Sequence, residues 1–252
     1  MAFIDNPWFY VFAGIAVLIA GVSKASMGTG FAGLAVPIMA LTIPANQAAA
    51  IMLPVLLAID AMTLYAFRGK FDRQLLWQIV PGGLLGTLIG TLLFKYVNAD
   101  SLRLFIGIEA IVFAIYRIAL AKRLERAPPT QRSLPKALVW STFSGFTSFI
   151  AHAGGPPLQQ YLVPLKLDKV MFVGTTTIFF ATMNFSKVVP YSWLGLLNFQ
   201  NVGTSLLLFP LVPIGTYLGL NVLKRLDQKA FTTVMNYALL VVGVKLCFDS
   251  LR

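Results

Sequence analysis

Residues 24–33 read Lys-Ala-Ser-Met-Gly-Thr-Gly-Phe-Ala-Gly, and residues 148–157, which begin 124 positions later, read Ser-Phe-Ile-Ala-His-Ala-Gly-Gly-Pro-Pro. Both stretches lie between apolar runs, and both hold glycines or prolines, which a helix interior tolerates poorly. Irregular backbone survives at membrane depth only where it is buried in protein or lines a cavity. Paired interruptions in two halves of a membrane protein indicate a binding site for a transported solute.

The composition is that of a chain embedded in a membrane. Of the 252 residues, 58% are hydrophobic and only 12% are charged, whereas a soluble protein is about 25% charged. The mean hydropathy is +0.78. Apolar runs of roughly 20 residues, each long enough to cross a bilayer core of about 30 Å, recur along the chain. We therefore predict an all-α, polytopic membrane protein.

The charge and the scarce reactive side chains limit the function further. A formal net charge of +11 in so apolar a chain indicates basic cytoplasmic loops that face lipid headgroups, and an anionic solute, rather than nucleic acid. One cysteine, Cys247, and one histidine, His152, exclude an internal disulfide and a Cys or His metal cluster. We expect no metal, no cofactor and no enzymatic activity.

A polar linker divides the chain into two halves that resemble each other. The predicted parts are a first transmembrane repeat, a basic cytoplasmic linker and a second transmembrane repeat, at residues 1–120, 121–136 and 137–252. At an offset of 124, Gly30 matches Gly154 and Asp60 matches Asn184. At an offset of 129, the motif Gly-Thr-x-x-Gly recurs at 86–90 and 215–219. Several matches in sequence order indicate a duplication.

Two topologies compete. If residues 8–44 and 135–165 each cross once, the chain has eight plain spans, four in each half, and loop Lys and Arg divide ten against seven. As one helix, residues 8–44 would extend roughly 55 Å, nearly twice the bilayer core. If each broken segment is a re-entrant hairpin followed by three spans, the division is fourteen against three. We favour this second topology, with two inverted repeats and both termini in the periplasm.

The interruptions are the predicted anion site. A broken helix exposes backbone N–H groups and a positive dipole end, and glycine lets an anion approach them. The alternative is that the small residues only let helices pack closely, as we expect of Gly82, Gly83, Gly86 and Gly90. The predicted substrate-binding residues are Lys24, Ser26, Gly28, Thr29, Gly30, His152, Gly154, Gly155, Asn184 and Lys187.

Ionisable groups inside apolar runs are functional candidates because they are costly at membrane depth. Lys24 either binds the anion or forms a structural ion pair with Asp60 or Glu109. Lys187 either binds the anion or snorkels to the interface. Asp60, Glu109 and His152 are the candidates for proton coupling, although the two acids are equally consistent with lysine partners and His152 with a neutral hydrogen-bond donor.

Two segments also carry a family resemblance. Residues 21–37, Gly-Val-Ser-Lys-Ala-Ser-Met-Gly-Thr-Gly-Phe-Ala-Gly-Leu-Ala-Val-Pro, resemble the glycine-rich first signature of the sulfite exporter TauE/SafE family. Residues 145–157 resemble its counterpart in the second repeat, and Ala25-Ser26-Met27 depart from the expected glycine content. The matching motif residues are Lys24, Gly28, Gly30, Gly33 and Pro37 in the first half, and His152, Gly154, Gly155, Pro156 and Pro157 in the second.

The resemblance implies a carrier in the bacterial inner membrane for sulfite or a related small sulfur oxyanion or organosulfonate. We expect a secondary transporter, coupled to protons because no ATPase motif is present, with the anion held near the midplane. The alternative is a passive anion channel that uses the broken helices as a filter. The expected partners are the sulfur anion, protons and membrane lipids, and assembly into a homodimer is left open.

Overall fold

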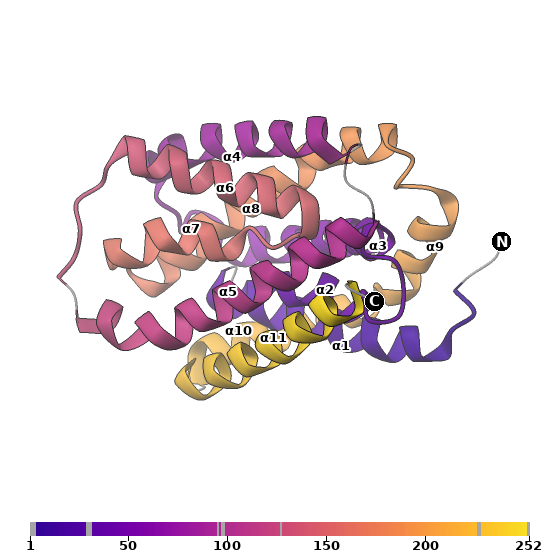
Figure 1. Cartoon of the computed structure of the whole chain (residues 1–252). Helices are drawn as coiled ribbons and strands as arrows, with labels where there is room; N and C mark the ends of the chain where they lie inside the picture. Colours follow the sequence, from indigo (N-terminus) through magenta and orange to yellow (C-terminus); the bar gives the residue numbers. More distant parts are fainter. Residues whose placement is uncertain are drawn as a thin grey trace.

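The computed structural model describes residues 4–28, 32–94, 96, 99–126, 128–225 and 228–250, and all regular structure within them is helical (Figure 1). The elements of the first half are α1 (Pro7–Met27), the short 3-10 helix η1 (Ala32–Leu34), α2 (Ala35–Met39), α3 (Ala45–Ala66), α4 (Arg73–Phe94) and α5 (Ala99–Arg126). Those of the second half are α6 (Leu134–Ala151), α7 (Gly155–Leu162), η2 (Val163–Leu165), α8 (Lys169–Trp193), α9 (Phe199–Leu208), α10 (Leu211–Arg225) and α11 (Gln228–Ser250).

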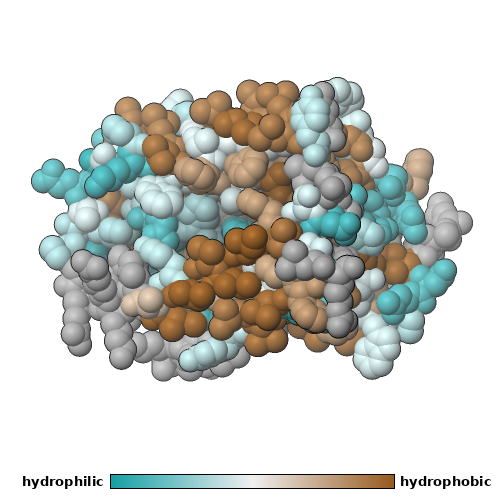
Figure 2. All heavy atoms as spheres, in the orientation of Figure 1, coloured by the Kyte–Doolittle hydropathy of each residue, from teal (hydrophilic) through white to brown (hydrophobic). Residues whose placement is uncertain are grey.

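The surface and the helix lengths fit a membrane protein. Within the described part, α1, α3 and α4 are each long and apolar enough to cross a bilayer, and α9 with most of α10 forms a fourth candidate, bent by 49°. Figure 2 shows apolar side chains over the middle of the visible face and hydrophilic ones towards its two ends. The predicted all-helical class with several apolar spans is confirmed.

Both predicted helix interruptions are present. Helix α1 ends at Met27, where Gly28 has φ 75°, and α6 ends at Ala151, where His152 has φ 54°. His152 is in the left-handed αL region, whereas Gly28, with ψ −39°, has a positive φ outside it; both conformations favour glycine, so a histidine at a cap is unusual. The predicted role of the prolines is corrected: Pro156 and Pro157 do not break a helix but lie in the first turn of α7, where a missing N–H costs nothing.

The long helices pair across the two halves of the sequence. Helix α1 packs along α10, α6 packs along α4, α5 packs along α11, and α3 contacts α8 near the centre. Glycine makes the close approaches: a Cβ at Gly86 would overlap the backbone of Thr142 and Phe146, and one at Gly215 would press on the backbone of Leu18. The interpretation of the α4 glycines as packing residues is confirmed.

The connection between α5 and α6 is shorter than the predicted linker, because α5 continues to Arg126. An ion pair and hydrogen bonds hold the connection to the start of α4 on one side and to η2 on the other. The Arg132 guanidinium forms an ion pair with the Asp72 carboxylate and donates to Gln74 Oε1 at 3.1 Å, while the Thr130 N–H donates to the Pro164 carbonyl at 2.9 Å. The loops that precede α4 and follow α7 therefore meet at this end of the molecule.

We predict that Gly145→Ala destabilises the protein, because the new Cβ would overlap the Gly83 carbonyl oxygen on the facing helix α4. Overpacking of this kind costs about 1–3 kcal/mol, which a lower thermal unfolding midpoint of the detergent-solubilised protein would report. Gly14→Ala is the matched control, since its Cβ would meet only the Leu211 Cδ1 atom at 3.4 Å. Equal midpoints for the two variants would contradict this account of the α4–α6 contact.

Candidate functional site

A buried ion pair joins helices α1 and α3 next to the first interruption. Lys24, in the last turn of α1, is 3% exposed, and Asp60, in α3, is 2% exposed. The Lys24 ammonium contacts the Asp60 carboxylate through Oδ1. The second oxygen, Oδ2, accepts a hydrogen bond of 2.7 Å from Asn184 Nδ2, in α8. Asp60 and Asn184, which are 124 residues apart, therefore meet directly.

A second lysine continues the network from the other side of Asn184. The Lys187 ammonium lies 3.0 Å from Asn184 Oδ1, 2.6 Å from the Ser148 carbonyl oxygen, 2.8 Å from Ser148 Oγ and 3.1 Å from His152 Nδ1. The side chain of Lys187 is completely buried. Of the two alternatives for Lys187, the one in which it snorkels to the interface is therefore wrong.

The hydrogen bonds assign the protonation states within this network. The Ala49 carbonyl, 2.9 Å from His152 Nε2, can only accept, so Nε2 carries the proton and Nδ1 accepts from Lys187. Because Asn184 donates to Asp60, its Oδ1 faces Lys187 as an acceptor. Three of the groups that Lys187 faces can only accept: the Ser148 carbonyl, His152 Nδ1 and Asn184 Oδ1. Donating to all three takes three N–H groups, which a protonated ammonium provides.

The network consequently holds an excess of positive charge. Two ammonium groups face one carboxylate, and the imidazole is neutral, which leaves a net charge of +1 within a buried cluster of Lys24, Asp60, Asn184, Lys187, Ser148 and His152. We call this set the charge cluster. A net charge in an apolar interior is costly unless a counter-ion accompanies it. An anion is the ligand that this arrangement favours.

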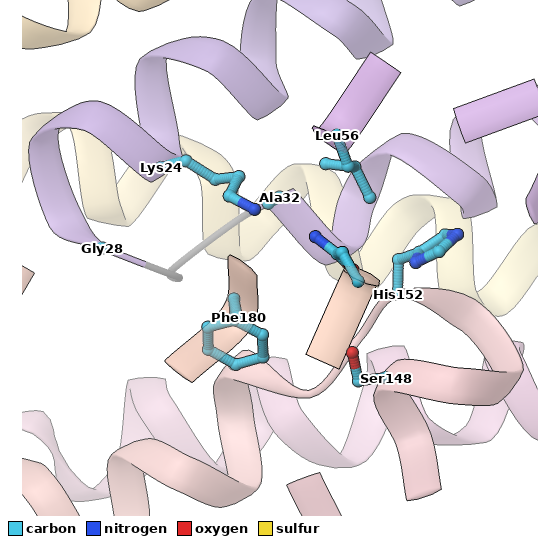
Figure 3. Close-up of a pocket in the computed structure, with 9 residues that line it drawn as sticks. Lys24, Gly28, Ala32, Leu56, Ser148, His152 and Phe180 are labelled. Carbon is cyan, nitrogen blue, oxygen red and sulfur yellow. The ribbon is translucent and has the colours of Figure 1, made fainter. Parts of the chain in front are cut away.

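A cavity adjoins the charge cluster at both interruptions. The cavity is narrow, with room inside it for about one water molecule. Figure 3 shows Lys24 extending from α1 on one side, with Ser148 and His152 on the other. The lining residues are Lys24, Gly28, Ala32, Leu56, Ser148, His152, Gly155, Phe180 and Asn184. The cavity thus takes residues from both halves of the chain.

The backbone contributes less to this site than the sequence suggests. Each interruption joins the C-terminal end of one helix to the start of another, so dipole ends of opposite sign lie close together. In the first turn of α7, Pro156 and Pro157 have no N–H, and the Leu158 N–H donates to the Gly154 carbonyl. Gly155 is the residue of that turn with an N–H to offer. The lysines, rather than a cradle of backbone N–H groups, supply most of the positive charge.

The predicted site residues divide into those that the structure brings together and those that it does not. Lys24, Gly28, His152, Gly155 and Asn184 line the cavity, and Lys187 lies directly behind Asn184. Thr29 and Gly30 lie outside the described residues.

Three further candidates have other surroundings. Ser26 does not line the described cavity, because its hydroxyl donates to the Val22 carbonyl of its own helix at 2.6 Å. The Gly154 carbonyl accepts from Ser144 Oγ at 2.6 Å. Glu109 lies on α5, where its Oε1 is buried without a hydrogen-bond partner among the described residues, and it makes no described contact with the charge cluster. The Lys24 partner is therefore Asp60.

Four lining residues, Ala32, Leu56, Ser148 and Phe180, are absent from the predicted substrate-binding set. The sequence did hold a signal for Ser148, because Ser148 matches Lys24 at the same offset, 124, that relates Asp60 to Asn184. Gly28 and His152, the two caps with positive φ, are matched in the same way. Leu56 and Phe180 also match at this offset, but neither was predicted, so the repeat alone did not indicate them.

Fold and site together define a helical membrane protein with a cationic, partly apolar cavity at two broken helices. The profile of the family described as sulfite exporter TauE/SafE matches residues 13–246, nearly the whole chain. The chain belongs to this family of membrane transporters. No curated protein and no solved structure matches it.

We predict that Lys24→Met lowers stability by about 3–5 kcal/mol, because it leaves the Asp60 carboxylate buried without its counter-ion. Adding Asp60→Asn should recover part of the loss, since the double variant buries neither charge. The thermal midpoints of the purified single and double variants measure this coupling. A double variant that loses as much as the two single losses combined would show that the ion pair does not stabilise the fold.

Proposed function

We propose that the protein is a secondary transporter, working as an exporter, for sulfite or a related small sulfur oxyanion or organosulfonate. The observation that carries the proposal is the net positive charge of the buried charge cluster beside a cavity that both interruptions line. Membership of the sulfite exporter family supports the class of solute. Lys24 would contact the anion, and Asn184, Ser148 and His152 would donate or relay hydrogen bonds from the opposite wall.

We further propose an architecture of two inverted repeats, each a re-entrant hairpin followed by three spans. The packing supports it. Helix α1 packs along α10, and their counterparts in the other half, α6 and α4, pack along each other in the same way. The contacts agree in detail. Gly86 meets Thr142, and Gly215 meets Leu18. Gly215 lies 129 residues after Gly86, and Thr142 lies 124 residues after Leu18, so these contacts are related by the same two offsets as the sequences. Between α5 and α11, Gly107 and Gly243 face each other's backbone, as residues on a two-fold axis would.

The positions of the termini support three spans in each half rather than four. An even number of spans in the first half would place the N-terminus and the connection between the halves on one side of the membrane. In Figure 1 the start of α1 and the end of α11 lie towards one end of the bundle, and the connection between α5 and α6 lies at the other. Ser250 Oγ donates to the Asp100 carbonyl, which places the end of α11 beside the start of α5. We propose periplasmic termini and a cytoplasmic connection.

Asp60 is the proposed group for coupling to protons, because the two hydrogen bonds of His152 keep its imidazole neutral and Glu109 lies apart from the charge cluster. Protonation of Asp60 would break its ion pair with Lys24, raise the net charge of the charge cluster from +1 to +2 and strengthen its hold on an anion that the ionised state already binds. Proton release would restore the pair and weaken the hold on the anion. Such competition between a carboxylate and a substrate for one lysine is a simple way to link their movements.

We expect reconstituted protein to move sulfite in a saturable manner that responds to an imposed pH gradient, and Lys24→Ala to reduce the flux at least about tenfold, because the variant loses the charge that faces the cavity. Lys245→Ala is the matched control, since Lys245 is an exposed lysine paired with Asp249 at 2.9 Å. Thermal midpoints establish that each variant is folded.

The other outcomes of this measurement separate the parts of the proposal. Flux of sulfite that persists in folded Lys24→Ala would keep the class of protein and reject the site. Flux that does not saturate and follows voltage would indicate a channel. Absence of flux for sulfite, thiosulfate and sulfonates would reject the proposed solute class.

We also expect a reporter fused after residue 252 to be active only when it is of the periplasmic type, because the termini are proposed to face the periplasm. A reporter inserted between α5 and α6 should behave in the opposite way. Alkaline phosphatase and green fluorescent protein fusions at the two sites provide the comparison. A fluorescent C-terminal fusion together with a fluorescent insertion would favour the eight-span topology.

A further inference from the structure

We infer that the net charge of the charge cluster makes the cavity selective for singly charged anions, hydrogen sulfite or a sulfonate, over doubly charged ones such as sulfate. This inference rests on the proposed function for the location of the anion site, and it adds the charge of the substrate. It also assigns a role to Asp60 that does not require contact with the solute: the carboxylate sets the total charge that an anion meets.

The physical basis is charge compensation in a buried site. One monovalent anion brings a cluster of net charge +1 to neutrality, whereas a divalent anion would leave one negative charge without a partner. Uncompensated charge in an apolar, poorly hydrated interior carries a large penalty. Among the described residues that line the cavity, Lys24 is the one charged side chain, so the cavity wall itself offers no second cation to balance a divalent anion.

The hydrogen-bond geometry favours a charged Lys187. Lys187 faces the Ser148 carbonyl, His152 Nδ1 and Asn184 Oδ1, which all accept hydrogen bonds, and it needs three N–H donors to satisfy them. The same pattern keeps His152 neutral, because a protonated Nδ1 would point a donor at the ammonium. One carboxylate against two ammonium groups is therefore the charge state that the hydrogen bonds favour.

The net charge of the charge cluster can be changed experimentally at Asp60 and Asn184. They occupy matching positions in the two halves, their side chains touch at 2.7 Å, and carboxylate and amide have nearly the same shape. Exchanging one for the other changes the charge of the cluster with little change in volume. Asp60→Asn raises the net charge to +2, Asn184→Asp lowers it to zero, and the double exchange Asp60→Asn with Asn184→Asp restores +1.

The experiment compares methanesulfonate with sulfate, two tetrahedral sulfur oxyanions of similar size that differ in charge. Binding to the purified protein at constant pH and ionic strength is read from the increase in thermal midpoint as each anion is titrated. We expect the wild type to bind methanesulfonate at least about tenfold more tightly than sulfate, and Asp60→Asn to reverse this preference. Asn184→Asp should bind neither anion, and the double exchange should regain the preference of the wild type.

The midpoint without anion shows whether each variant is folded, and the double exchange serves as the control for variants in which a single change disturbs packing. A wild type that binds sulfate as tightly as methanesulfonate, or binds neither, overturns the inference. So does a folded Asp60→Asn whose preference equals that of the wild type. Charge-dependent binding without any flux in liposomes would instead reject the proposed transport function and leave the charge rule intact, so the two failures are distinguishable.

Discussion

A lysine buried at membrane depth must find either a carboxylate or a complete set of hydrogen-bond acceptors, and the interior of this protein meets that demand twice in different ways. Lys24 uses the Asp60 carboxylate. Lys187 uses the carbonyl of Ser148, the imidazole of His152 and the amide of Asn184. Both ammonium groups lie at the C-terminal ends of interrupted helices, α1 and α6, where a cation also interacts favourably with the helix dipole.

His152 shows how the interruption and the charge cluster depend on each other. A left-handed backbone costs a non-glycine residue roughly 1–2 kcal/mol, and the matching cap in the first half is a glycine, Gly28. The conformation directs the imidazole so that Nε2 donates to the Ala49 carbonyl of α3 while Nδ1 accepts from Lys187. These two hydrogen bonds offset the strain. They also join the end of α6 to both central helices, so the side chain acts as a structural connector of the site.

The sequence predicted the features that depend on residue type and spacing. Helix-breaking residues placed the two interruptions, the repeat matched Asp60 with Asn184, and the cost of intramembrane charge singled out Lys24, with Asp60 or Glu109 as its possible ion-pair partner. Features that depend on the direction in which a side chain points could not be predicted from the sequence. For Lys187 the sequence left open whether it snorkels to an interface, because it comes late in its apolar run, yet α8 continues to Trp193 and buries it. Ser26 turns its hydroxyl to its own helix.

Duplication alone could not have produced this charge state. If the two halves were identical, every charge near the proposed two-fold axis would occur twice, and the net charge of a site on that axis would be even. An odd charge requires matched positions that have diverged. Asp60 opposite Asn184 supplies such a difference, while Lys24 matches Ser148, and Lys187 matches Thr63. The proposed repeat would supply the frame that brings the broken helices together. In the proposed charge state, the divergence of these positions gives the cavity a single excess positive charge, and with it a reason to hold one monovalent anion.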